Sequence, residues 1–110
     1  RQVGILAAAG LYALEHHVTR LAEDHAHAER LAKGLSGAGY LVEAPQTNMV
    51  FVKVAKERCA ALKAHLAAAG VVAIVSPRTR LVTHLDVDTA GVDRAVAAFA
   101  SFNRIPTAAE

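Results

Sequence analysis

The chain has 110 residues, of which 54% are hydrophobic, and this composition suits one small folded domain rather than a disordered segment. Its net charge of +2 comes from basic residues scattered among acidic ones, without interleaved aromatic residues, so we expect no nucleic-acid partner. The longest nearly apolar run, residues 3–14, is far shorter than the roughly 20 residues that cross a bilayer, so we expect no membrane span.

The sequence has neither an initiator methionine nor a signal-peptide pattern, so we expect a part of a longer protein. Its single cysteine, Cys59, cannot form an internal disulfide, and this fits a reducing cytoplasm. We therefore predict a cytoplasmic location.

Residues 2–35 contain no proline, and their second part places apolar residues at helical spacing, so they predict one long helix. Gly34, Gly37 and Gly39 are expected to end it. The first part of this helix, residues 3–14, is apolar on every side. Such a helix is buried in a large protein or against partners, so we expect other domains or subunits to cover it.

Residues 40–44 and 48–54 are rich in β-branched and aromatic residues and predict a hairpin of two strands. Residues 56–69 return to helical spacing, with Gly70 as the C-terminal cap. Residues 71–75 and 80–86 predict two further strands, which a Ser-Pro-Arg-Thr turn connects.

The last helix is expected to begin after Asp88, which we predict to be its N-terminal cap. Its buried face consists of apolar residues at helical spacing, namely Val92, Val96, Phe99 and Phe102. The resulting order predicts an α/β fold: a two-layer sandwich with a small, largely antiparallel sheet, a long N-terminal helix, one domain over residues 1–104 and a tail over residues 105–110.

Two segments carry a family resemblance: RQVGILAAAGLYAL at residues 1–14 and RLVTHLDV at residues 80–87. Both resemble the C-terminal part of low-specificity and allo-threonine aldolases, which are pyridoxal phosphate (PLP) enzymes of fold type I, the aspartate aminotransferase type. The resemblance extends to about residue 102. It implies the small domain of an enzyme that cleaves threonine, allo-threonine or similar β-hydroxy-α-amino acids to glycine and an aldehyde. It also implies a homotetramer or homodimer, in which this domain contacts its own large PLP-binding domain.

Arg80 opens an otherwise apolar strand, and its planar guanidinium is suited to bind a carboxylate through two parallel hydrogen bonds. The residues alone favour another interpretation, in which Arg80 extends to solvent at the strand end or pairs with a nearby acid. The resemblance implies that Arg80 binds the substrate α-carboxylate, with Arg78 as a weaker candidate. It also implies that Arg1, and less strongly Gln2, contacts the cofactor phosphate of a neighbouring subunit, although Arg1 could instead be a solvated terminus.

His84 lies four residues from Arg80, which is roughly 13 Å along a strand, so both cannot bind one carboxylate. The resemblance places the catalytic histidine in the large domain, and we expect His84 to be a core histidine. Thr83 and Asp86 are expected to bond local backbone groups.

Four histidines, at positions 16, 17, 25 and 27, lack the His-x3-His spacing of helical zinc sites, so we expect no metal site. None of the four lysines has the Ser-Lys-Gly context of the family's Schiff-base lysine. We therefore expect no catalytic residue in this chain, and no activity from it alone.

Two alternatives remain open at this point. One is the small domain of another fold type I enzyme, an aminotransferase or a β-eliminating lyase, which would also use an arginine for the substrate carboxylate. The other is a free-standing regulatory module that binds an amino acid.

Overall fold

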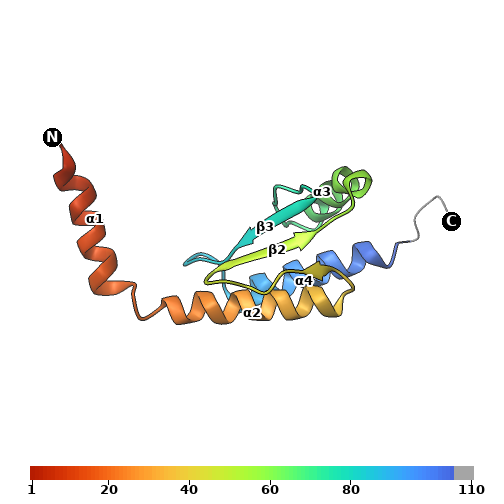
Figure 1. The fold of residues 1–110 in the computed structure, drawn as a ribbon, viewed down its shortest axis with the longest axis horizontal. Helices are drawn as coiled ribbons and strands as arrows, with labels where there is room; N and C mark the ends of the chain where they lie inside the picture. Colours follow the sequence, from red (N-terminus) through yellow and green to blue (C-terminus); the bar gives the residue numbers. More distant parts are fainter. Residues whose placement is uncertain (106–110) are drawn as a thin grey trace.

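The computed structural model describes residues 1–105. Its elements in chain order are α1 (Val3–His16), α2 (Leu21–Gly37), β1 (Leu41–Val42), β2 (Met49–Lys53), the 3-10 turn η1 (Lys56–Arg58), α3 (Cys59–Ala68), β3 (Arg78–Val82) and α4 (Thr89–Asn103). Figure 1 shows α2 and α4 side by side along one face of the sheet. The predicted α/β class with a small antiparallel sheet is confirmed.

The sheet has the order β1-β2-β3, and both pairs of strands are antiparallel. Val50 lies opposite Leu81, and Phe51 lies opposite Arg80. Because side chains alternate along a strand, Val50 faces the helices and is fully buried, whereas Arg80 lies on the other, exposed face.

The core lies between the sheet and the helices. Its largest fully buried apolar side chains come from α2, α3, α4 and β2, namely Leu35, Leu62, Leu66, Val92, Phe99, Val50 and Val52. Tyr40 adds an edge-to-face contact with Phe99 and donates a hydrogen bond of 2.8 Å from its hydroxyl to the Phe99 carbonyl. The predicted apolar face of the last helix is confirmed for Val92, Phe99 and Phe102, while Val96 is half-buried.

The prediction of one uninterrupted helix over residues 2–35 is wrong, because residues 17–20 form a turn between α1 and α2. Val18 and Thr19 are β-branched and have low helix propensity, which weakens the helix at this point. α1 then leaves the body of the domain, as Figure 1 shows, and none of its residues is buried. No helix in residues 1–105 is both long enough and apolar enough to cross a membrane.

The two predicted strands after α3 also differ from the structure. Residues 71–75 join no strand ladder within the described residues, and the last strand is β3 at residues 78–82 rather than 80–86. Pairing with β2 reaches back to Pro77, whose carbonyl accepts from the Val54 amide at 3.0 Å. Beyond Thr83 the chain turns, and Leu85 is exposed.

The predicted helix ends are confirmed at Asp88, which accepts a hydrogen bond of 2.7 Å from the Gly91 amide, and at Gly70, whose φ of 76° suits a residue without Cβ. Gly39, with a φ of 93°, follows the end of α2. Gly34, in contrast, lies inside α2 and does not end it. The predicted tail at residues 105–110 lies, except for Ile105, outside the described residues.

Candidate anion-binding site

Arg80 lies in the middle of β3 on the exposed face of the sheet. The ion pairs found in residues 1–105 do not include Arg80. A guanidinium that is exposed on a rigid strand and has no internal acid is available to an external anion, and its planar fork matches a carboxylate. The geometry therefore leaves Arg80 free for the binding role that the family resemblance implies.

Arg78 lies two residues earlier on the same face, but its guanidinium is already engaged. It donates two hydrogen bonds of 2.8 Å to the Glu43 carboxylate and stacks over the Phe51 ring at 3.8 Å from the ring centre. The hydrogen bond from Arg78 lowers the pKa of Glu43 below its ordinary value and raises the pKa of Arg78. Arg78 is thus a structural ion-pair residue, and of the two arginines only Arg80 is free.

Thr83 fixes the end of β3 to two other elements. Its amide donates to the Asn48 carbonyl at 2.9 Å, and the Asn48 side-chain amide donates to the Thr83 carbonyl at 2.8 Å. The Thr83 hydroxyl donates to the backbone carbonyl of Asp24 in α2 at 2.7 Å. The prediction that Thr83 bonds local backbone is wrong, since both partners are remote in sequence.

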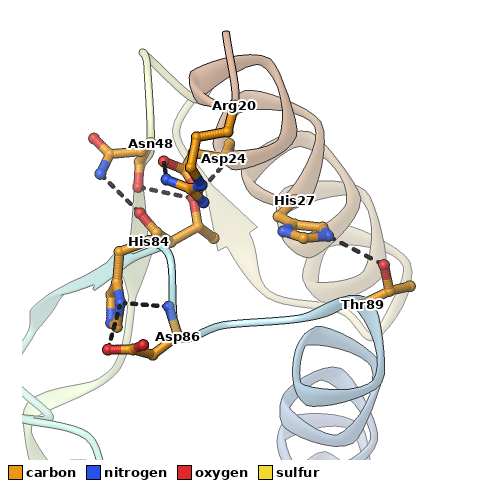
Figure 2. A network of polar contacts seen from close by, with 8 residues as sticks. Arg20, Asp24, His27, Asn48, His84, Asp86 and Thr89 are labelled. Carbon is orange, nitrogen blue, oxygen red and sulfur yellow. Dashed lines mark hydrogen bonds and ion pairs between the residues drawn. The ribbon is translucent and has the colours of Figure 1, made fainter. Parts of the chain in front are cut away.

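The Asp24 carboxylate is itself held by Arg20, which donates hydrogen bonds of 2.8 and 3.1 Å to it. Figure 2 shows this pair at the start of α2, close to Asn48. Arg20, Asp24 and Asn48 were absent from the sequence prediction. Only the four-residue spacing of Arg20 and Asp24 indicated part of this network, because such pairs are neighbours on a helix.

His84 is exposed, so the expectation of a core histidine is wrong. Its Nδ1 atom lies 3.3 Å from the Asp86 amide and 4.0 Å from the Asp86 carboxylate, as Figure 2 shows. His84 continues the alternation of β3, and it lies on the same exposed face as Arg80 and Val82. The prediction for Asp86 is also wrong, because its carboxylate contacts His84 rather than the backbone.

A groove of about 650 Å³ runs beside β3, and Arg80 contributes to its lining. Arg94 from α4 lines the same groove, together with Asp86 and Asp88. The rest of the lining is largely apolar. Charged groups of both signs therefore line the groove.

The other predicted ligand-binding residues lie elsewhere. Arg1 is exposed at the start of α1, and Figure 1 shows this end far from β3, so one chain does not bring Arg1 and Arg80 together. Gln2, beside it, is also exposed and has a φ of 61°. All four lysines are exposed, and no group of three His, Cys, Asp or Glu residues in positions 1–105 has the geometry to hold a metal.

Comparison with known proteins assigns the chain to a family. The model of the family described as beta-eliminating lyase matches residues 1–57, just over half of the sequence. The chain belongs to this family. It is 53% identical over 87 residues to the low specificity L-threonine aldolase of Escherichia coli K12, a match that covers 79% of this chain and 26% of that protein.

A plant protein, low-specificity L-threonine aldolase 1 of Arabidopsis thaliana, is 34% identical over 107 residues, which cover 90% of this chain and 30% of that protein. The resemblance to threonine aldolases is therefore confirmed, and the chain is a threonine aldolase-related domain. It spans only about a quarter to a third of the length of these curated relatives.

Proposed function

We propose that the full-length protein is a PLP-dependent threonine aldolase, and that this chain is its small domain. The enzyme would cleave the Cα–Cβ bond of threonine, allo-threonine or a similar β-hydroxy-α-amino acid to give glycine and an aldehyde. The observation that carries this proposal is the unpaired, exposed guanidinium of Arg80 on a sheet whose neighbouring arginine is neutralised by Glu43. The family relationship supports the reaction class.

PLP, when bound, supplies an electron sink for the charge that develops on the substrate Cα. The residues of this chain fit a role in binding the substrate rather than in holding PLP. Every lysine is exposed on the surface of the domain, and Arg80 is free to bind an anion. Arg80 would hold the substrate α-carboxylate through two hydrogen bonds and so fix the direction of the bond to be broken. The Thr83 contacts with Asn48 and Asp24 would keep β3, and with it Arg80, in place.

The remaining parts of the proposal concern the assembly. The Schiff-base lysine, the catalytic histidine and most of the PLP site would lie in the large domain, against which this domain packs. Arg1 would contact the cofactor phosphate of a neighbouring subunit in a cytoplasmic homotetramer or homodimer. The exposed apolar surface of α1 supports such contacts, since it is covered by nothing in residues 1–105.

The test is steady-state kinetics of the full-length protein with Arg80→Ala, Arg80→Lys and, as matched control, Arg78→Ala. Removing one partner of a desolvated charge pair costs about 2 to 5 kcal/mol. This corresponds to a loss of roughly 30-fold to several-thousand-fold in kcat/KM. Arg80→Lys should recover only part of the activity, because an ammonium lacks the two-pronged geometry. Arg78→Ala should retain most of it.

Thermal unfolding of the same variants separates a binding role from a structural one. Arg80→Ala should leave Tm nearly unchanged, because the arginine abandons no internal partner. If Arg80→Ala instead lowers Tm strongly while threonine cleavage by the folded enzyme is normal, Arg80 is structural and the proposed role is wrong.

The description of the matched family favours one alternative, a β-eliminating lyase in which Arg80 binds the same carboxylate. Product analysis distinguishes the two reactions. A threonine aldolase releases glycine and acetaldehyde from threonine. A β-eliminating lyase instead releases the Cβ leaving group, a 2-oxo acid and ammonia from an amino acid that carries such a group.

A further inference from the structure

One edge of the sheet is open within the described residues. β3 is an outer strand, and two hydrogen bonds fix which of its peptide groups point towards β2. The Thr83 amide donates to the Asn48 carbonyl, and the Pro77 carbonyl accepts from the Val54 amide. In an antiparallel pair the bonded residues alternate, so the odd-numbered residues of β3 face β2. The N–H and C=O groups of Arg80 and Val82 therefore point to the open edge.

Residues 71–75 have the side-chain pattern of a strand but no strand partner. Val71, Ala73 and Val75 pack against the core, whereas Val72 and Ile74 are 96% and 87% exposed. This period of two is typical of a strand that lies in the plane of a sheet. Yet residues 72–75 make no backbone–backbone hydrogen bond with any residue that the structure describes.

These two unpaired stretches line the same groove of about 650 Å³. Its base is apolar and includes Leu31, Leu81, Val92 and Phe99. Peptide groups that are left without a hydrogen-bond partner beside an apolar surface cost free energy. Native proteins therefore cover or pair such strand edges. The groove thus offers what an extended strand needs: peptide groups along its sides and an apolar base for alternate side chains.

We infer that an extended strand from the part of the same polypeptide outside residues 1–110 lies in this groove. It pairs with the Arg80 and Val82 edge of β3, and residues 72–75 offer peptide groups to its other side. The relatives are three to four times as long as the matched region, so most of the polypeptide is available to supply the strand. A segment of the same chain also has the advantage of a high effective concentration over a separate peptide or a second copy.

Amide hydrogen exchange of the full-length protein, resolved to single residues, tests this inference. The amides of Arg80 and Val82 should exchange at least about 100-fold more slowly than unprotected amides. The Thr83 amide is the internal control, since its bond to Asn48 makes it slow in either case. Fast exchange at Arg80 and Val82 beside a slow Thr83 would show an open edge and overturn the inference.

A variant pair tests the pairing itself. Val82→Pro removes an N–H that points away from β2, so the hydrogen bonds between β2 and β3 are kept, and edge strands tolerate proline at such positions. With a strand paired there, Val82→Pro should lower Tm by roughly 5 °C or more relative to the control Val82→Ala, which keeps the N–H. Equal Tm values for the two variants would count against the strand even if the amides were protected.

Dilution identifies the source of the strand. Protection that persists when subunits are separated comes from the same polypeptide, whereas protection lost on dissociation comes from a second copy and contradicts the inference. Neither readout depends on catalytic activity, so the proposed reaction and this strand can fail independently.

Discussion

Replacing Gly34 by alanine tests how closely α2 and α4 approach each other. A Cβ atom at Gly34 would lie 2.7 and 2.8 Å from the two γ-methyl carbons of Val96, and 3.3 Å from its Cβ. The first two distances are far below normal van der Waals contact. Val96 cannot easily rotate away, because a valine in a helix strongly prefers one χ1 rotamer.

Two effects of opposite sign determine how Gly34→Ala changes the free energy of unfolding. Alanine is favoured over glycine inside a helix by about 1 kcal/mol. Overpacking of a well-packed contact costs about 1 to 3 kcal/mol. Gly34→Ala should therefore lower the free energy of unfolding by up to about 2 kcal/mol rather than raise it. In a Val96→Ala background the two contacts below 3 Å are absent and only the 3.3 Å contact with Cβ remains, so the same substitution should stabilise by up to about 1 kcal/mol.

Urea unfolding of the chain and its single and double variants, at one fixed protein concentration, measures this coupling. We expect a coupling energy of about 1 to 3 kcal/mol between positions 34 and 96. Gly37→Ala is the matched control, since a Cβ there meets nothing within 4 Å. If Gly34→Ala stabilises the original chain as much as Gly37→Ala does, the close approach of the two helices is refuted.

Three further outcomes are expected. Arginines lower the pKa of Glu43 and Asp93 below their ordinary values of 4.5 and 3.8, so both ion pairs stabilise the fold above these values and lose their effect as pH falls below them. The urea midpoint of unfolding should fall as the pH is lowered, and it should fall less steeply for Glu43→Gln than for the original chain. If the two proteins show the same dependence on pH, the ion pair does not act in this way. The exposed apolar α1 should make the isolated chain self-associate in sedimentation over a concentration series, whereas a strict monomer would not fit. Incubation of the chain with PLP should give no stoichiometric borohydride-reducible adduct at one lysine and no threonine turnover.

The elements that the sequence predicted well are those that local patterns specify. α4 begins after Asp88 and buries Val92 and Phe99, because a capping carboxylate and a 3.6-residue period act within a few residues. The break at residues 17–20 was missed because the apolar spacing continues across it. Residues 71–75 show the opposite case: their alternation is present, but a strand also requires a partner, and no partner lies in residues 1–105.

The candidate site was predictable in residue type but not in its contacts. Arg78 and Arg80 have similar sequence surroundings. Strand register places Glu43 beside Phe51 and Arg80 on the other side of Phe51, yet the hydrogen bonds join Glu43 to Arg78 diagonally and leave Arg80 free. His84 shares a face with Arg80 and Val82, and the sequence does not show that this face of the strand is the exposed one. The role of Thr83 depends on partners 35 and 59 residues away, which no local pattern reports.

The pairing of Arg78 with Glu43 also bears on how selective the exposed sheet face is. Two free guanidinium groups two residues apart would offer an anion two competing positions. Glu43 neutralises one of them, and the stack of Arg78 on Phe51 holds that pair against the sheet. A single free guanidinium remains, on a strand fixed through Thr83 to both Asn48 and α2. A carboxylate that meets this face thus has one free guanidinium to bind, and in the proposed function this anchor would help to orient the bond that is broken.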